Sequence, residues 1–439
     1  KAMQAAMEVN GTADEKAKAA KDAAKVALAQ SLGKAEVSNI EVNEFINEGA
    51  KDAVGDAMKA CMESTTNITE QEKCRSTSAK DTLAKSLGKA TVTQVDVELF
   101  IRKGAQEKAM EAMKAAASVN GTSVAERKEA AKEALKAALG KAEISNTKLE
   151  EFIEDGAKTA VKNAMSACAA AAESETGAAA KQAKLDNCRS SSAREALSNA
   201  LGKRDSNDVS KTEVEAFVRN AAKTAIADAM KAAVEDDSTS EAEKRQAVKQ
   251  ALAQSLGQSE IDDTSLEFFK KKGAQDAIAD TMKSCVEAAK LEATKGEVEA
   301  ATEACAANSA KEALQTALGT KTITDADVNK FVQQGGKASA AVSRKNCMSA
   351  AGTDVTEQKK CSSDRVELIE TIKESTGVLS VDDYLAEAYV LEGASGKATE
   401  TVVACTSLAG SDTEKLNEVK LEARNMVAIL LGRDASVED

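Results

Sequence analysis

The 439-residue sequence contains no proline, no tryptophan and no histidine, and aromatic residues make up only 2% of it. Because the commonest helix breaker is absent and alanine, lysine and glutamate are strong helix formers, the composition predicts an almost entirely α-helical chain. The lack of histidine removes the side chain that most often acts as a general base. No Gly-x-Ser-x-Gly, P-loop or dinucleotide-binding motif appears, so we expect neither an enzyme nor a bound cofactor.

Charge and hydropathy argue against two further classes of protein. The formal net charge is −13, and acidic and basic residues are interspersed along the chain. A nucleic-acid-binding protein normally carries a basic stripe and stacking aromatics, so we expect no nucleic-acid partner. No apolar run approaches the roughly 20 residues that a helix needs to cross a bilayer, so we expect no membrane span. We interpret the charged positions as solvated helix faces.

One pattern recurs along the whole chain, namely a glycine, preceded by leucine in all copies but one, and then an aromatic residue. The glycines are Gly33, Gly88, Gly140, Gly202, Gly257, Gly319, Gly377 and Gly432. The aromatic residues are Phe45, Phe100, Phe152, Phe217, Phe269, Phe331 and Tyr389. Self-similarity at a nearly fixed period is the signature of a repeat array, in which each unit buries its apolar face on its neighbours.

Each unit is predicted to contain a long and a shorter helix. The long helix begins at a capping box, Ser38 with Glu41 in the first complete unit, in which each side chain satisfies a free amide of the other residue. The corresponding caps are predicted at Thr93, Ser145, Ser210, Thr324 and Ser380. The second helix, of about four turns, ends at the leucine–glycine pair, since glycine is the usual residue just past a helix C-terminus.

Most of the long helices also carry a glycine in their interior, four residues after the aromatic. Gly49 is the first of them. A glycine inside a helix costs about 1 kcal/mol relative to alanine. We therefore expect another helix or a ring to approach the backbone closely at this position. The methionines that lie 13 residues after the aromatic, beginning with Met58, are interpreted as core residues rather than as a ligand groove.

The predicted fold is all-α, with tandem αα-hairpin repeats of about 55 residues in an extended, solenoid-like or filament-forming array. The predicted divisions are a partial repeat (1–33), repeats 1 to 7 (34–88, 89–140, 141–202, 203–257, 258–319, 320–377 and 378–432) and a short remainder (433–439). Neither end of the sequence resembles a polar capping repeat. We expect either a segment of a longer repetitive protein or a subunit whose ends are covered by copies of itself.

The nine cysteines follow the same repeat. Five lie 16 residues after the aromatic, at the end of the long helix: Cys61, Cys168, Cys285, Cys347 and Cys405. Four lie at the start of the second helix: Cys74, Cys188, Cys305 and Cys361. Within a unit the two cysteines face each other across the hairpin mouth, where their Cα atoms can reach disulfide distance.

We predict the bridges Cys61–Cys74, Cys168–Cys188, Cys285–Cys305 and Cys347–Cys361, each adding about 3 kcal/mol by loop closure. The alternative is that the cysteines are buried free thiols. This alternative is disfavoured because, from repeat to repeat, the two cysteines are present or absent together. A zinc site is less favoured still, because histidine and Cys-x-x-Cys pairs are both missing. Cys405 is left over, which indicates an intermolecular bond, or else an inert thiol.

Three Asn-x-Thr glycosylation sequons occur, at Asn10, Asn67 and Asn120. All three fall in the loop between the two helices of a unit, where a glycan would be exposed to solvent. Disulfides and sequons together indicate an extracellular protein, or one in the lumen of a secretory compartment.

The leading hypothesis for function is a secreted, disulfide-stapled structural protein that assembles with copies of itself into an extracellular filament, sheath or matrix. The motivation is repetition without a distinct reactive site, together with one unpaired cysteine. The alternative hypothesis is a binding module that holds an apolar ligand or a protein partner between its helical repeats.

Overall fold

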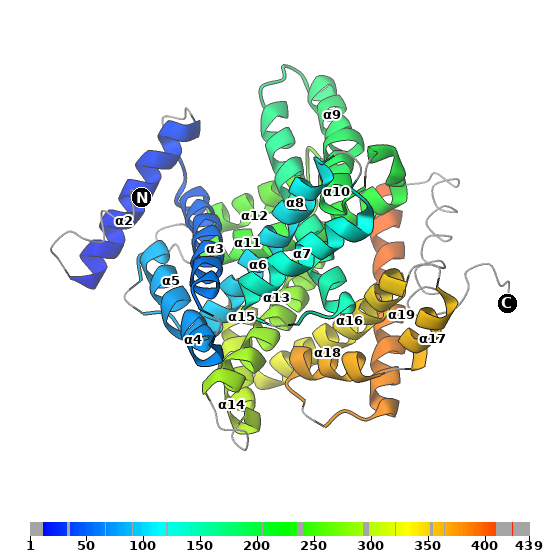
Figure 1. Cartoon of the computed structure of the whole chain (residues 1–439). Coiled ribbons are helices and arrows are strands. Elements are labelled where there is room, and N and C mark those ends of the chain that lie inside the picture. Colours follow the sequence, from blue (N-terminus) through cyan, green and yellow to red (C-terminus); the bar gives the residue numbers. More distant parts are fainter. Residues whose placement is uncertain are drawn as a thin grey trace.

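The computed structural model describes residues 12–32, 36–65, 67–89, 91–119, 122–141, 143–203, 205–234, 240–292, 298–320, 322–351, 354–363, 365–378, 380–409 and residue 424. Throughout these ranges all regular secondary structure is helical (Figure 1). The all-α fold class predicted from the composition is therefore confirmed. Cap glycines Gly33 and Gly432 lie outside the described residues.

Long and short helices alternate along the described chain. The long helices are α3 (Asn39–Glu63), α6 (Gln94–Ala117), α8 (Asn146–Ala172), α11 (Lys211–Val234), α13 (Asp263–Glu292), α16 (Asp325–Ala351) and α19 (Asp383–Ala409). The unbroken shorter helices are α2 (Ala13–Leu32), α7 (Val124–Leu139) and α12 (Glu241–Leu256). A short turn of 3-10 helix, η3 (Ser206–Asp208), lies in the lengthened connection before α11.

In the units that contain two cysteines the second helix is interrupted, where the sequence predicted one continuous helix. It is built from α4 (Ile68–Lys73), η1 (Cys74–Ala79) and α5 (Lys80–Leu87); from α9 (Ala178–Asn187), η2 (Cys188–Ser192) and α10 (Ala193–Ala200); from α14 (Val298–Cys305), η4 (Ala306–Ala310) and α15 (Lys311–Leu318); and from α17 (Val355–Ser363) and α18 (Val366–Thr376). In the first three of these units a π-helical turn begins at the bridged cysteine or directly after it.

The helix boundaries have identifiable local causes. Ser38 accepts a hydrogen bond from the Glu41 amide while the Glu41 carboxylate accepts one from the Ser38 amide, and Thr93 forms the same box with Asp96. The glycines that end the second helices have positive φ angles of 60° to 71°: Gly88, Gly140, Gly202, Gly257, Gly319 and Gly377. Only glycine adopts this left-handed conformation without strain, which explains why the residue recurs there.

The predicted cap at Ser380 is wrong. Helix α19 begins at Asp383, and the Asp382 carboxylate accepts a hydrogen bond from the Leu385 amide at 2.7 Å. Asp382 lies seven residues before its aromatic, as Ser38 does in the first complete unit. The capping position is thus defined by its distance from the aromatic, and aspartate fills it as well as serine does.

Packing follows the order of the chain. Each long helix packs on the next one, and the second helix of a unit packs on the long helix of the unit before it, as α7 does on α3, α12 on α8 and α18 on α13. The larger clusters of buried apolar side chains also follow one another in sequence, over residues 24–42, 50–153, 157–269, 274–332 and 340–390. The apolar core is therefore divided along the chain rather than gathered at one centre.

A second set of contacts joins long helices that are three apart in order. Helix α3 packs on α11, α6 on α13, and α8 on α16. As a result α6, α8, α13 and α16 cross the middle of the molecule, whereas α2 lies at one edge and α9 and α14 project at opposite ends of the view (Figure 1).

Candidate functional site: helix interfaces and a charged interior

The recurring aromatic residue is buried in every described long helix except the first. Six of these rings are between 1% and 7% exposed: Phe100, Phe152, Phe217, Phe269, Phe331 and Tyr389. Phe45 of α3 is 47% exposed. The ring of Phe152 also lies under the Arg102 guanidinium of the preceding long helix, at 4.8 Å from its centroid. The aromatic therefore anchors the interface between one long helix and the one before it.

The glycine four residues later marks where two helix backbones meet. A Cβ built on Gly104 would lie 2.8 Å from the Lys51 carbonyl oxygen of the preceding long helix, and one on Gly273 would lie 2.8 Å from that of Lys223. Real Cβ atoms do not come this close to a backbone oxygen, so a side chain here would push the helices apart. The expected close approach is thus made by a helix backbone and not by a ring.

The recurring methionines pack against the cap glycines of the following unit. Met165 Cε lies 2.9 Å from a Cβ position on Gly257, and Met282 Cε lies 2.8 Å from that on Gly377. Met58, Met113 and Met230 make the equivalent approach to the cap glycines of their own following units. All five methionines are buried, as the sequence predicted for core residues. Met230 also lines a surface groove of about 890 Å³ beside α12, α13 and α15.

The interior between the helix layers is charged, contrary to the expectation that the charges would all lie on solvated faces. Lys162 of α8 pairs with Asp228 of α11 at 2.7 Å and with Glu48 of α3 at 3.3 Å. Lys345 of α16 pairs with Glu154 of α8 at 3.0 Å. Ion pairs therefore join successive long helices, as Lys162 with Asp228, and also helices two or three apart, as Lys162 with Glu48 and Lys345 with Glu154.

Burial and pairing shift the pKa values of these groups in opposite directions. Burial alone would raise the pKa of Glu154, but Lys345 and Lys158 lower it to about 2. Burial and then the Lys397 charge lower the pKa of Lys223 well below its ordinary value. Burial, followed by the Asp228 charge, raises the pKa of Glu44 to about 7. Glu154 therefore stays charged at neutral pH, whereas Glu44 titrates there.

A cavity of about 170 Å³ lies inside this charged region and is lined by long helices from α3 to α19. Lys158, Lys223, Asp276 and Asn346 contribute to its walls. Charged and amide side chains share the walls with apolar ones, and the volume holds only a few water-sized molecules, so the cavity suits ordered solvent better than an apolar ligand. In the described ranges no cluster of three or more acidic or cysteine side chains is placed to hold a metal ion.

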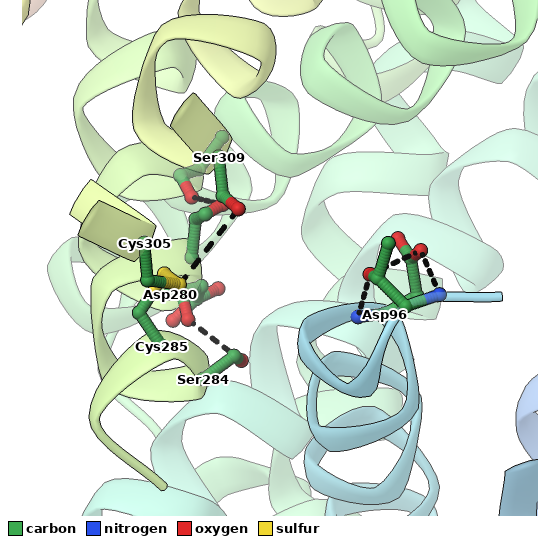
Figure 2. Close-up of a disulfide and its surroundings, with 9 residues drawn as sticks. Asp96, Asp280, Ser284, Cys285, Cys305 and Ser309 are labelled. Atoms are coloured by element: carbon green, nitrogen blue, oxygen red, sulfur yellow. Dashed lines mark hydrogen bonds between the residues drawn. A yellow bond between two sulfur atoms is a disulfide. The ribbon is translucent and has the colours of Figure 1, made fainter. Parts of the chain in front are cut away.

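The cysteines join the two helices of a unit as the spacing predicts. The bridges are Cys61–Cys74, Cys168–Cys188, Cys285–Cys305 and Cys347–Cys361, with Cα–Cα distances of 5.6 to 5.7 Å. Figure 2 shows the third bridge, where Cys285 follows Ser284, whose hydroxyl donates to the Asp280 carbonyl at 2.9 Å. The bridges all close local hairpins, because each joins residues 13 to 20 positions apart.

The remaining predicted site residues are described only in part. Asn67 is exposed in the loop before α4, and its amide donates to the Thr65 hydroxyl at 3.1 Å. Asn10 and Asn120 lie outside the described residues. Cys405 falls within α19, but its side chain is outside the described part of the chain. The predicted glycosylation and the predicted intermolecular bond therefore stay predictions.

Comparison with known proteins assigns no family to this arrangement. No protein-family model matches the chain, and no curated protein matches it. Of the helices in the described ranges, none combines the length and the apolar character that crossing a membrane requires. The function is therefore argued from the helix interfaces themselves.

Proposed function

We propose that the protein is a structural, disulfide-stapled solenoid of αα-hairpin repeats that is secreted and assembles into an extracellular filament, sheath or matrix. Each long helix contacts the next one and, in three cases, the one three further on. These contacts favour a tight superhelix with about three repeats per turn. The core clusters that follow one another in sequence support the same organisation.

The observation that carries the proposal is the recurrence of one set of contacts. The buried aromatic, the glycine at the helix crossing and the methionine over the cap glycine appear at the same positions in one unit after another. In this interpretation every unit has the same mechanical task, and no unit carries a reactive centre that the others lack. The four bridges reinforce the hairpin mouths and favour an oxidising compartment.

Negative-stain electron microscopy of the purified full chain, over a range of concentrations, tests this proposal. We expect filaments or sheets whose repeat distance stays constant along their length. Monodisperse compact particles at every concentration, with no higher species in sedimentation, would contradict a structural role. A disulfide-reduced sample is the comparison, because its hairpins lose their staples while the sequence is unchanged.

A further inference from the structure

The disulfides divide the second helix of their units into two parts with different contacts. The part after the bridge packs on another unit, since α10 packs on α6, α15 on α11 and α18 on α13, in each case the long helix of the unit before. The part up to the bridge packs mainly within its own unit, α9 on α8, α14 on α13 and α17 on α16, whereas α4 packs mainly on the η1 turn that follows it. We call α4, α9, α14 and α17 the arms; α9 and α14 are the two helices that project in Figure 1.

Helix α9 shows how little of an arm is buried. Of its ten residues only Leu185 is buried. This side chain forms a small apolar cluster with Ala169 and Ala172 of α8, separate from the larger clusters of the core. The arm begins after Gly177, which has no side chain to cap the helix. An isolated helix of this length is marginal in water, so the arm depends on its tether to α8.

The units without cysteines show a different start of the second helix. Helices α7 and α12 begin at capping boxes, Ser123 with Glu126 and Ser240 with Glu243. These glutamates lie 14 residues before their cap glycines, and three units have a cysteine at the same distance: Cys74, Cys188 and Cys305. A described unit of the array therefore has either a second helix that starts at a capping box or an arm that is held by a disulfide.

Each bridge joins a buried cysteine to one that is partly exposed. The buried cysteines are at most 7% exposed: Cys74, Cys188, Cys285 and Cys361. Their partners are of intermediate exposure: Cys61, Cys168, Cys305 and Cys347. A small dithiol can reduce such a bridge in two exchange steps, in which its thiolates displace the two cysteine sulfurs in turn. Two electrons and two protons pass to the cysteines, and the dithiol becomes a cyclic disulfide.

We propose that each bridge is a redox-sensitive switch for its arm, so that reduction unfolds α4, α9, α14 and α17 and leaves the rest of the array folded. The bridge stabilises the arm by closing a short loop, and this contribution is lost on reduction. The long helices and the later part of each second helix keep their contacts with neighbouring units. The inference does not depend on filament formation. It means that the arms are folded in an oxidising compartment and open in a reducing one.

Hydrogen exchange followed by mass spectrometry, on the full chain with and without a dithiol, tests this proposal. We expect the amides of α9 to exchange at least tenfold faster after reduction, and those of α10 to keep their rates. The first turns of α7 and α12 are the matched control, because they start second helices that have no bridge, and we expect no change there. Equal rates for α9 in the two states would overturn the proposal. Equally faster exchange in α7 and α12 would also overturn it, because the whole array would then have loosened.

A variant that lacks one bridge tests whether an arm opens independently. Cys168→Ser with Cys188→Ser is measured without reductant, so that the other three bridges stay closed. We expect α9 to lose at least tenfold in protection, while α14 and α17 keep theirs. Added dithiol is then expected to speed exchange in α14 and α17 without a further change in α9. A loss of protection that spreads to α10 and α11 would overturn the proposal, because the arm would not be separable from the packed part of the unit.

Discussion

The sharpest consequence of the helix packing concerns one substitution made at two equivalent positions. Gly49 and Gly273 each lie four residues after the aromatic, in the interior of a long helix. Replacement by alanine adds the same methyl group and the same gain in helix propensity at both. Only the surroundings differ, because the Cβ at position 49 meets nothing within 4 Å among the described residues, and the one at position 273 meets a backbone.

The magnitudes follow from these contacts. Gly49→Ala is expected to stabilise the protein by about 1 kcal/mol, the difference between glycine and alanine inside a helix. At Gly273 the new methyl would lie 2.8 Å from the Lys223 carbonyl oxygen and 3.6 Å from its carbon. A backbone cannot swing aside as a side-chain end does, so α11 and α13 must separate, at a cost of about 1 to 3 kcal/mol.

The difference between the two variants is the informative quantity, because helix propensity cancels in it. Gly273→Ala is expected to be less stable than Gly49→Ala by about 1 to 3 kcal/mol, which is the cost of overpacking alone. Hydrogen exchange followed by mass spectrometry suits the measurement, because it reports the opening of α3 and α13 separately and does not assume that the whole array unfolds in one step.

Equal shifts of the same sign at the two positions would refute the reasoning. Equal stabilisation would mean that the helices α11 and α13 do not approach as closely as the carbonyl contact requires. Equal destabilisation would mean that the backbone at Gly49 is covered as closely as the backbone at Gly273. We expect Gly273→Ala to lower the hydrogen-exchange protection of α13 and Gly49→Ala to raise that of α3.

Three further predictions concern the bridges, the interior ion pairs and pH. Replacing both Cys168 and Cys188 by serine is expected to lower the stability of their hairpin by about 3 kcal/mol. Thermal unfolding would show a lower melting temperature, and added reductant would cause no further loss of stability in this hairpin. Asp228→Ala is expected to destabilise the protein by about 3 kcal/mol in urea unfolding, because the buried Lys162 loses its shorter ion pair and keeps only Glu48; Glu133→Ala, at an exposed pair, is expected to change the stability by about 0.5 kcal/mol or less. Because burial raises the pKa of Glu44 from 4.5 to about 7, its protonated form favours folding, and this contribution is complete below pH 4.5 and lost as the pH rises through 7. Glu44→Gln is therefore expected to stabilise the protein at pH 8 by up to about 3 kcal/mol and to have little effect at pH 4, and an unchanged pH profile in urea titrations would contradict this.

Much of the local structure could be predicted because it depends on residues close together in the chain. The capping box of Ser38 with Glu41 and the positive φ of Gly88 each involve one helix end. The bridge between Cys61 and Cys74 spans 13 residues within one hairpin. Even the error at Ser380 was local, since the distance from the aromatic identifies Asp382 as the capping residue.

The charged interior could not be predicted in the same way. Lys345 and Glu154 are 191 positions apart, and Lys162 and Glu48 are 114 apart. A helical periodicity records which side chains share a face, but it does not record which other helix that face meets. Charged residues spaced along a helix therefore predict a solvated surface equally well, and only the contacts between different helices show that they are paired inside the protein.

The amino-acid sequence by itself determined the helical content, the helix ends, the hairpin bridges and the repeat of aromatic, glycine and methionine, because each of these follows from backbone sterics and short chain separations. Only the tertiary structure decided that the glycine meets a carbonyl of the preceding helix, that the methionine covers a cap glycine and that lysines and carboxylates fill the interior. These contacts depend on how each helix is placed relative to its neighbours in space. That placement is set by the packing of many side chains together, which no single stretch of sequence contains.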